Sequence, residues 1–234
     1  MTSIEQNAVC RHFGACGGCQ FQNVPYAEQC RNKETMLEEL FAEFWQAPIP
    51  VEPSPVQWHY RNKVDPNFGF RHYEQAPPPD FERETVIGFK PKGRWRWPID
   101  IEECRIGPNG FTELLAAVRS WYRDQGLAGY DNRRQTGFLR ALLVREAKRT
   151  GQYLVVLITA DGDFDGDSFV KAVQAVYPNA GIYRGIFRGL AEVAFADEME
   201  HLAGPETVDE ELHIPDGDSQ RRLRFRLSPF SFFQ

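Results

Sequence analysis

The sequence lacks a long apolar run, a basic leader and any repeated unit. Its longest apolar stretches, such as residues 153–159, are far shorter than the roughly 20 residues that a membrane-spanning helix needs. Residues 1–7 have neither the basic nor the apolar region of a signal peptide. No internal repeat or low-complexity tract is present. We therefore expect a soluble, cytoplasmic protein that makes no membrane contact.

The sequence also has no excess of basic over acidic residues. The 234 residues include 27 Lys and Arg against 33 Asp and Glu, a formal net charge of −6, which excludes a uniformly basic nucleic-acid-binding protein. The acidic charge is concentrated in residues 150–218, where 14 acidic side chains outnumber 3 basic ones. Residues 83–96 and 133–149 are rich in basic side chains, so they predict either solvated sheet faces or a local track for phosphates. Aromatic residues interleaved with these basic runs are Trp95, Trp97 and Phe138.

Cysteine is scarce, and its placement is uneven. Of the 5 cysteines, only Cys104 lies outside the first thirty residues. A cytosolic chain keeps its thiols reduced, so a cysteine cluster there favours metal binding over disulfides. Cys10, Cys16 and Cys19 form the pattern Cys-x5-Cys-Gly-Gly-Cys, in which the two glycines allow a tight turn between thiolates.

Three clustered cysteines with a distant fourth suit a cubane iron–sulfur cluster. Cys104 is the best fourth ligand, because Cys30 lies on the apolar stripe of a predicted helix and is expected to be buried as a small hydrophobe. Tetrahedral zinc is the alternative that the same spacing allows. The sequence therefore predicts a 4Fe-4S cluster or zinc on Cys10, Cys16, Cys19 and Cys104.

The remaining pattern predicts an α+β fold. A loop over residues 1–22 is followed by a long helix over 23–46, where apolar residues recur at spacings of three, four and seven. The acidic run at 161–166 is expected to cap a helix, because Ala172 stands where a calcium loop needs a bidentate Glu. The further expected elements are strands between 60 and 101, helices at 111–126 and 169–176, and strands at 138–147, 152–160, 181–188, 207–214 and 220–227.

Four motifs occur in order along the chain. They are the cysteine pattern with Gln22, Tyr60-Arg61-Asn62-Lys63, Cys104, and Ser228-Pro229-Phe230-Ser231-Phe232-Phe233-Gln234. In this order they resemble motifs of the iron–sulfur-containing RNA uracil-5-methyltransferases. Enzymes of that family use S-adenosylmethionine to methylate uridines of 23S ribosomal RNA or, in some members, of transfer RNA.

The resemblance implies a division of the chain into four parts. Residues 1–22 are the iron–sulfur loop, 23–46 the helix that packs on the catalytic domain, and 47–227 a central RNA-binding domain, mixed α/β with an antiparallel sheet. Residues 228–234 begin the methyltransferase domain, whose Rossmann-like remainder is expected to be missing, since no glycine-rich loop after a strand is left to bind S-adenosylmethionine. By this resemblance the cluster is structural, the cofactor binds only the full-length enzyme, and the chain alone is an inactive monomer.

The resemblance also assigns site residues and partners. Arg61 and Lys63 are the expected RNA contacts, and Phe233 and Gln234 match positions that hold the target uracil. The expected partner is RNA, 23S ribosomal RNA first and transfer RNA second. Two other functions stay open: a stand-alone iron–sulfur module that binds RNA or acts as an adaptor without catalysis, and a redox carrier.

Overall fold

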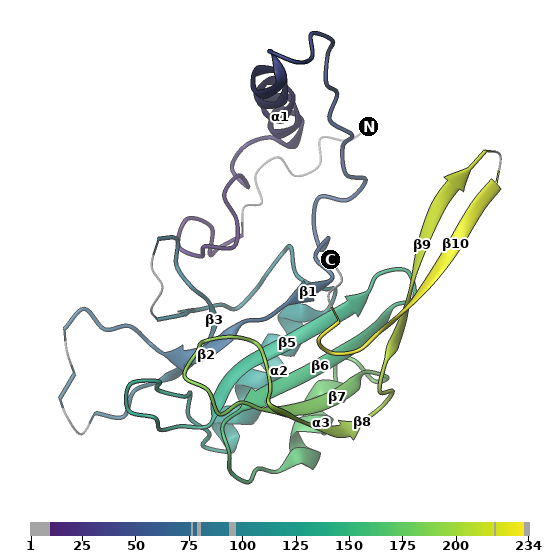
Figure 1. Ribbon diagram of the computed structural model, residues 1–234. Coiled ribbons are helices and arrows are strands. Elements are labelled where there is room, and N and C mark those ends of the chain that lie inside the picture. Colours follow the sequence, from purple (N-terminus) through teal and green to yellow (C-terminus); the bar gives the residue numbers. More distant parts are fainter. Residues whose placement is uncertain (1–9, 76, 79–80, 94–96, 218, 232–234) are drawn as a thin grey trace.

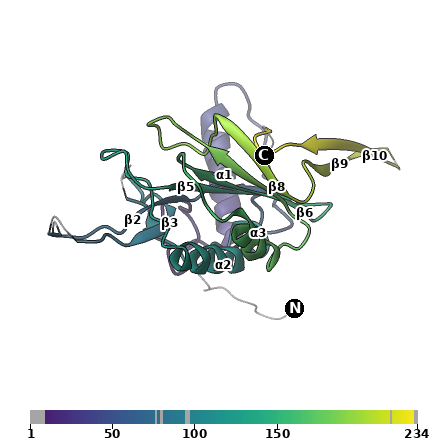
Figure 2. The same cartoon turned by 90° about the horizontal axis from the view of Figure 1, so that it is seen from below.

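A computed structural model describes residues 10–75, 77–78, 81–93, 97–217 and 219–231. The main body is an eight-stranded sheet with two helices on one face, and a long hairpin projects from it (Figures 1 and 2). A further helix stands apart from the sheet, at the end of extended chain (Figure 1). No described helix is long and apolar enough to cross a membrane.

The elements follow the chain in an α+β order. They are α1 (Tyr26–Phe41), β1 (Lys63–Val64), β2 (Asn67–Phe70), β3 (Thr85–Phe89), β4 (Ile99–Asp100), α2 (Phe111–Asp124), β5 (Leu139–Ala147), β6 (Gln152–Thr159), α3 (Gly166–Gln174), β7 (Gly181–Ile186), β8 (Glu198–Ala203), β9 (Val208–Asp216) and β10 (Ser219–Leu227). The sheet has the strand order β4-β3-β2-β5-β6-β7-β8, and β1 also pairs with β5. β9 and β10 form the separate hairpin.

The topology corrects the fold class expected from the sequence. The sheet is not antiparallel throughout, because β6 and β7 run parallel, from Leu154 opposite Gly181 to Thr159 opposite Ile186. The parallel pair arises because α3 carries the chain back between the two strands, whereas a tight turn at Gly151 joins β5 and β6. Apolar alternation predicts that a segment is a strand, but it does not say in which direction its neighbour runs.

The core lies on both faces of β5 and β6. α2 and α3 cover one face, where Phe111, Leu115 and Phe169 are buried against the sheet. The opposite face holds a smaller cluster that includes Leu143 and Val156, together with residues from the base of the hairpin. All nine residues of β5 are buried, which makes this strand the centre of the fold.

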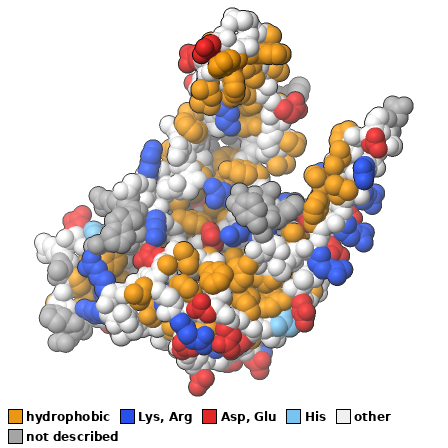
Figure 3. All heavy atoms as spheres, viewed as in Figure 1, with side chains coloured by type: hydrophobic (Ala, Val, Ile, Leu, Met, Phe, Trp, Pro, Cys, Tyr) orange, Lys and Arg blue, Asp and Glu red, His pale blue; other side chains and the backbone are white. Residues whose placement is uncertain are grey.

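The first helix is shorter and more exposed than expected. α1 ends at Phe41, and none of its residues is buried. Large apolar side chains such as Met36 and Leu40 are exposed there, and Figure 3 shows apolar side chains gathered over this end of the molecule. Cys30 is half-exposed rather than buried, so its expected burial is wrong. The apolar stripe that predicts the helix is therefore not buried against the sheet, and the stripe alone does not reveal this.

Tyr153 gives the fold a measurable pH dependence. Burial and then the Glu146 carboxylate, which accepts from the Tyr153 hydroxyl at 3.1 Å, raise the pKa of this tyrosine from 10.0 to about 12. A raised pKa contributes stability that is complete below about 10 and is lost as the pH rises through about 12. We expect Tyr153→Phe to flatten the fall of the unfolding free energy over this range, measured by urea denaturation. A Tyr153→Phe protein whose unfolding free energy falls with pH as steeply as that of the unmodified protein would contradict the assignment.

Candidate functional site

Four thiols from two distant segments line one small pocket, here called the thiol pocket. Cys10, Cys16 and Cys19 come from the loop before α1, and Cys104 follows β4. The remaining lining includes Arg61, whose backbone N–H donates to the Ile106 carbonyl at 3.0 Å. The structure therefore brings together all four cysteines that the sequence predicts as ligands, and it leaves Cys30 outside.

The cysteine loop is held against the segment around Cys104 by side chains of opposite charge. The backbone N–H of Arg11 donates to the Glu103 carboxylate at 3.0 Å, and the Arg11 guanidinium pairs with Glu102. The side chain of Gln22 accepts from the Cys10 N–H at 3.0 Å. These polar contacts hold the loop in place, in addition to the half-buried Phe13, which lines the same pocket as Val64 and Ile101.

Gly17 fixes the loop to a second neighbour. Its N–H donates to the Lys90 carbonyl at 3.0 Å, and a Cβ atom there would lie 2.8 Å from the same oxygen. Only glycine allows this approach. The loop therefore packs on the backbone of Lys90, which connects the thiol pocket to a second pocket described below.

The electrostatics of the thiol pocket favour neutral thiols when nothing is bound. Burial raises the pKa of Cys10 and Cys16, and it raises the pKa of Cys104 to about 11. Cys19 and Cys16 raise the pKa of Cys104 further, which reflects how near the sulfurs lie to one another. Two contacts act in the other direction on Cys16: the Gly18 N–H, 3.4 Å from its Sγ, and the charge of Arg61.

The thiols do not form a ready site for one ion. Among the residues that the structure describes, no three His, Cys, Asp or Glu side chains are grouped so that they could hold a metal ion. The iron–sulfur loop that was part of the expected fold class is therefore not evident as a formed site. Ligand spacing along the chain indicates which residues can converge, but it does not set the distances between their sulfurs.

The other residues predicted from the sequence are placed differently. Arg61 lines the thiol pocket, whereas Lys63 lies on β1 and its Nζ is 3.5 Å from Asp65 Oδ2. The two expected RNA contacts thus have different surroundings. Phe233 and Gln234 lie outside the described residues.

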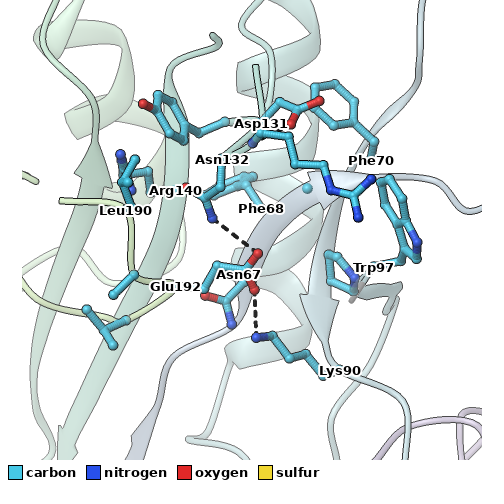
Figure 4. A pocket seen from close by; sticks show the side chains of 16 residues that line it. Asn67, Phe68, Phe70, Lys90, Trp97, Asp131, Asn132, Arg140, Leu190 and Glu192 are labelled. Carbon is cyan, nitrogen blue, oxygen red and sulfur yellow. Dashed lines mark hydrogen bonds and ion pairs between the residues drawn. The ribbon is translucent and has the colours of Figure 1, made fainter. Parts of the chain in front are cut away.

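A second pocket, here called the arginine pocket, lies between β2, the start of β5 and the loop after β7 (Figure 4). It is lined by Asn67, Phe68, Gly69, Phe70, Lys90, Trp97, Pro98, Tyr130, Asp131, Asn132, Arg133, Arg140, Leu190, Ala191, Glu192 and Val193. The sequence analysis did not predict it as a site. The available signal was the interleaving of Trp97 with the two basic runs, which supply Lys90 and Arg140.

Comparisons with known proteins give relatives along the whole chain, although no family model matches it. An uncharacterised RNA methyltransferase of Clostridium tetani is 31% identical over 240 residues, covering 97% of this chain and 48% of the relative. A tRNA (uracil(54)-C(5))-methyltransferase of Pyrococcus furiosus is 28% identical over 232 residues, covering 99% and 48%. The chain thus spans about half the length of the curated relatives it matches.

A solved structure shares the fold. The tRNA (uracil-54, C5)-methyltransferase of Pyrococcus abyssi, crystallised with S-adenosyl-L-homocysteine, matches with a TM-score of 0.67 and 24% identity, over 94% of this chain and 46% of that one. This match contradicts the expectation that methyltransferase architecture is missing from the chain. The expected inactivity of the chain alone also lacks support, because the relatives that match nearly all of it are named methyltransferases.

The expectation that methyltransferase architecture is missing was wrong for a physical reason. Short motifs mark positions along a chain, but they do not say how much of a fold surrounds them. Over nearly its whole length, this chain is therefore similar to about half of each of several RNA methyltransferases.

Proposed function

We propose that this chain serves an S-adenosylmethionine-dependent RNA uracil-5-methyltransferase, binding the RNA and holding a 4Fe-4S cluster on Cys10, Cys16, Cys19 and Cys104. The observation that carries the proposal is the convergence of these four thiols on one pocket, in a chain whose relatives are named RNA methyltransferases. The units proposed are a cysteine loop over 1–22, a helix segment over 23–46 and an RNA-binding body over 47–227.

The spacing of the cysteines along the chain is the reason for proposing a cluster rather than zinc. A single zinc ion holds each sulfur at about 2.3 Å, so its four ligands must crowd around one point. The described thiols share one pocket but are not grouped to hold a metal ion as they stand, which does not distinguish the two cofactors. A cubane cluster accepts one thiolate at each of four separate irons, which suits three closely spaced cysteines with a distant fourth.

The cluster's proposed role is structural. When bound, it supplies positive charge that keeps the four thiols ionised, against the burial that now raises the pKa of Cys10, Cys16 and Cys104. The chain's own residues then hold the cysteine loop in place, to the segment after β4 through Arg11 and Glu103, and to the backbone of Lys90 through Gly17. Arg61 stays beside these thiolates as a fixed positive charge.

The proposed substrate is a uridine in structured RNA. Transfer RNA is the first candidate, because the Pyrococcus furiosus relative is named for uracil 54 of tRNA. The second is 23S ribosomal RNA, which the motif resemblance favours. Arg61 and Lys63 are proposed to contact the RNA backbone, and Phe233 and Gln234 the target base.

Binding and methyl transfer test the proposal separately. The protein, purified without oxygen, is titrated into labelled tRNA and 23S ribosomal RNA segments, and 5-methyluridine is measured by mass spectrometry after addition of S-adenosylmethionine. We expect salt-dependent RNA binding and methylation of uridine at C5. Absence of RNA binding at low salt would overturn the proposal. RNA binding without 5-methyluridine would instead favour a non-catalytic RNA-binding module.

The double substitution Arg61→Ala with Lys63→Ala tests the RNA contacts. We expect weaker binding and a shallower dependence of the logarithm of affinity on the logarithm of salt concentration, by roughly one unit for each phosphate contact removed. Fluorescence anisotropy at several salt concentrations measures both. Lys63→Ala alone is needed because Arg61 also lines the thiol pocket. Lys171→Ala, on the exposed face of α3, is the matched control, and a slope equal to the control's would refute the assignment.

A further inference from the structure

Arg140 is directed into the arginine pocket by an irregularity in β5. The pairing of β5 with β6 shifts between Leu139 and Ala141, so Arg140 is the extra residue of a β-bulge. Because of it, Leu139 and Leu142 face the same core although they are three residues apart. The bulge thus interrupts a strand whose residues are all buried, and bulges commonly re-aim a side chain beside a functional site.

The Arg140 side chain is buried and only partly satisfied. It is 8% exposed, and its guanidinium carbon lies 3.7 Å from the ring centre of Tyr130 and 5.0 Å from that of Phe187. One terminal nitrogen donates to the Gly189 carbonyl at 2.9 Å. Its Nε has no hydrogen-bond partner among the described residues. A buried charged donor without a partner is costly, so a ligand that accepts from it gains affinity.

A buried acceptor on the same pocket is also unmatched. Asn132 donates through Nδ2 to Glu192 Oε1 at 3.1 Å, which orients its amide, and its Oδ1 is buried without a partner in the part of the chain described. Arg140 and Asn132 both line the pocket, and each carries a buried polar atom without a partner among the described residues, one a donor and the other an acceptor. Both atoms are covered in this structure, so Glu192 has to move before a ligand can bond them. A phosphate presents acceptors alone, whereas the edge of a nucleobase presents both.

An aromatic wall stands at the other side of the pocket. Figure 4 shows Phe70 and Trp97 on this side and Leu190 opposite. Trp97 remains 37% exposed and has a left-handed backbone, with φ 62°. Gly69 makes this placement possible, because a Cβ atom there would lie 2.7 Å from the Pro98 ring. A strained backbone that presents an exposed aromatic ring to a pocket suits a stacking surface.

The Glu192 carboxylate pairs with two other residues that line the pocket. It lies between Lys90, whose Nζ is 2.6 Å from Oε2, and the Asn132 amide (Figure 4). The loop that carries Glu192 exposes Leu190 and Val193. The Glu192 carboxylate thus occupies the position in which a ligand's phosphate would pair with the Lys90 ammonium group.

We propose that the arginine pocket binds one unpaired nucleobase of the RNA substrate, with its edge bonded by Arg140 Nε and Asn132 Oδ1 and its face against Trp97. Lys90 then pairs with the phosphate of the same nucleotide, after the Glu192 carboxylate has moved away from it. The inference rests on the proposed RNA function. It adds to that function a specific binding site, which is lined by 16 residues and is separate from the thiol pocket.

Binding of a short fluorescein-labelled single-stranded RNA tests the pocket. We expect Trp97→Ala and Asn132→Ala each to weaken binding by roughly tenfold, since stacking and edge contacts are lost. Glu192→Gln should strengthen binding several-fold, because the competing carboxylate is gone, and a gain of affinity cannot come from misfolding. Trp45→Ala, at an exposed tryptophan beyond α1, and Lys171→Ala are matched controls that should bind as the unmodified protein does.

The outcomes separate this proposal from the function it rests on. If the unmodified protein binds no RNA, the proposed function fails. If it binds RNA but the Trp97, Asn132 and Glu192 variants bind equally well, only the pocket assignment is refuted. Uridine and adenosine monophosphates are titrated in parallel, and a free nucleotide that binds as tightly as the RNA would replace the RNA strand as the ligand. Photocrosslinking of 4-thiouridine-labelled RNA to the peptide that contains Trp97 would support the assignment directly.

Discussion

Replacing Cys104 by serine is expected to abolish loading of the metal cluster. Cys104 is the one proposed ligand supplied by the segment after β4, and it lines the thiol pocket together with the other three thiols. Without its thiolate the remaining ligands come from residues 10–19 alone, and nothing closes the site. The anaerobically reconstituted unmodified protein should be brown, absorb at about 400 nm and contain iron and acid-labile sulfide. Cys104→Ser should lose the absorbance and both elements almost completely.

Cys30→Ser is the matched control for this experiment. Cys30 is also half-exposed and reduced, but it lies on α1 outside the thiol pocket. Its loss should leave iron, sulfide and absorbance unchanged. A Cys104→Ser protein that keeps its full iron and sulfide would contradict the ligand set. A colourless unmodified protein with stoichiometric zinc would refute the cluster and restore the alternative that the cysteine spacing allows.

The substitution Gly88→Ala is expected to destabilise the sheet strongly. Gly88 lies on β3 opposite Asp100 of β4, and a Cβ atom there would lie 1.8 Å from the Ile99 carbonyl oxygen. Backbone on both sides must separate, so we expect the unfolding free energy to fall by about 3 kcal/mol or more. Chemical denaturation followed by circular dichroism measures this loss.

The same change should also affect the thiol pocket. β4 leads directly to Cys104, so displacing it moves the fourth proposed ligand away from Cys10, Cys16 and Cys19. Reduced iron content in the folded fraction of Gly88→Ala is therefore expected. Gly166→Ala is the control, since its Cβ would meet Leu202 at an ordinary 3.7 Å at the start of α3, where alanine is favoured by up to about 1 kcal/mol. Equal stability of the two variants would show that β3 and β4 are not packed as described.

Much of the local structure could be predicted from the sequence, because it depends on neighbours in the chain. The apolar spacing in 111–126 predicts α2, and alternation predicts β10, where Arg222, Arg224 and Arg226 are exposed. The expected cap is confirmed, since Asp165 accepts from the Ser168 N–H at the start of α3. β8 was missed, because its sequence Glu-Met-Glu-His-Leu-Ala carries little apolar alternation and it forms only by pairing with β7.

The sequence by itself determined that Cys10, Cys16 and Cys19 lie close together, because they are at most nine residues apart. It favoured Cys104 over Cys30 as the fourth cysteine partly because Cys30 was expected to be buried, whereas the tertiary structure leaves Cys30 half-exposed and places Cys104 in the thiol pocket. The sequence did not determine the direction of β7, the exposure of α1 and Cys30, or the arginine pocket. That pocket joins Lys90, Trp97, Asn132, Arg140 and Glu192, which are up to about a hundred residues apart. Their meeting depends on strand order, on a bulge in β5 and on the close approach of Gly69 to Pro98. These are properties of packed backbones, which residue patterns along one chain segment do not encode.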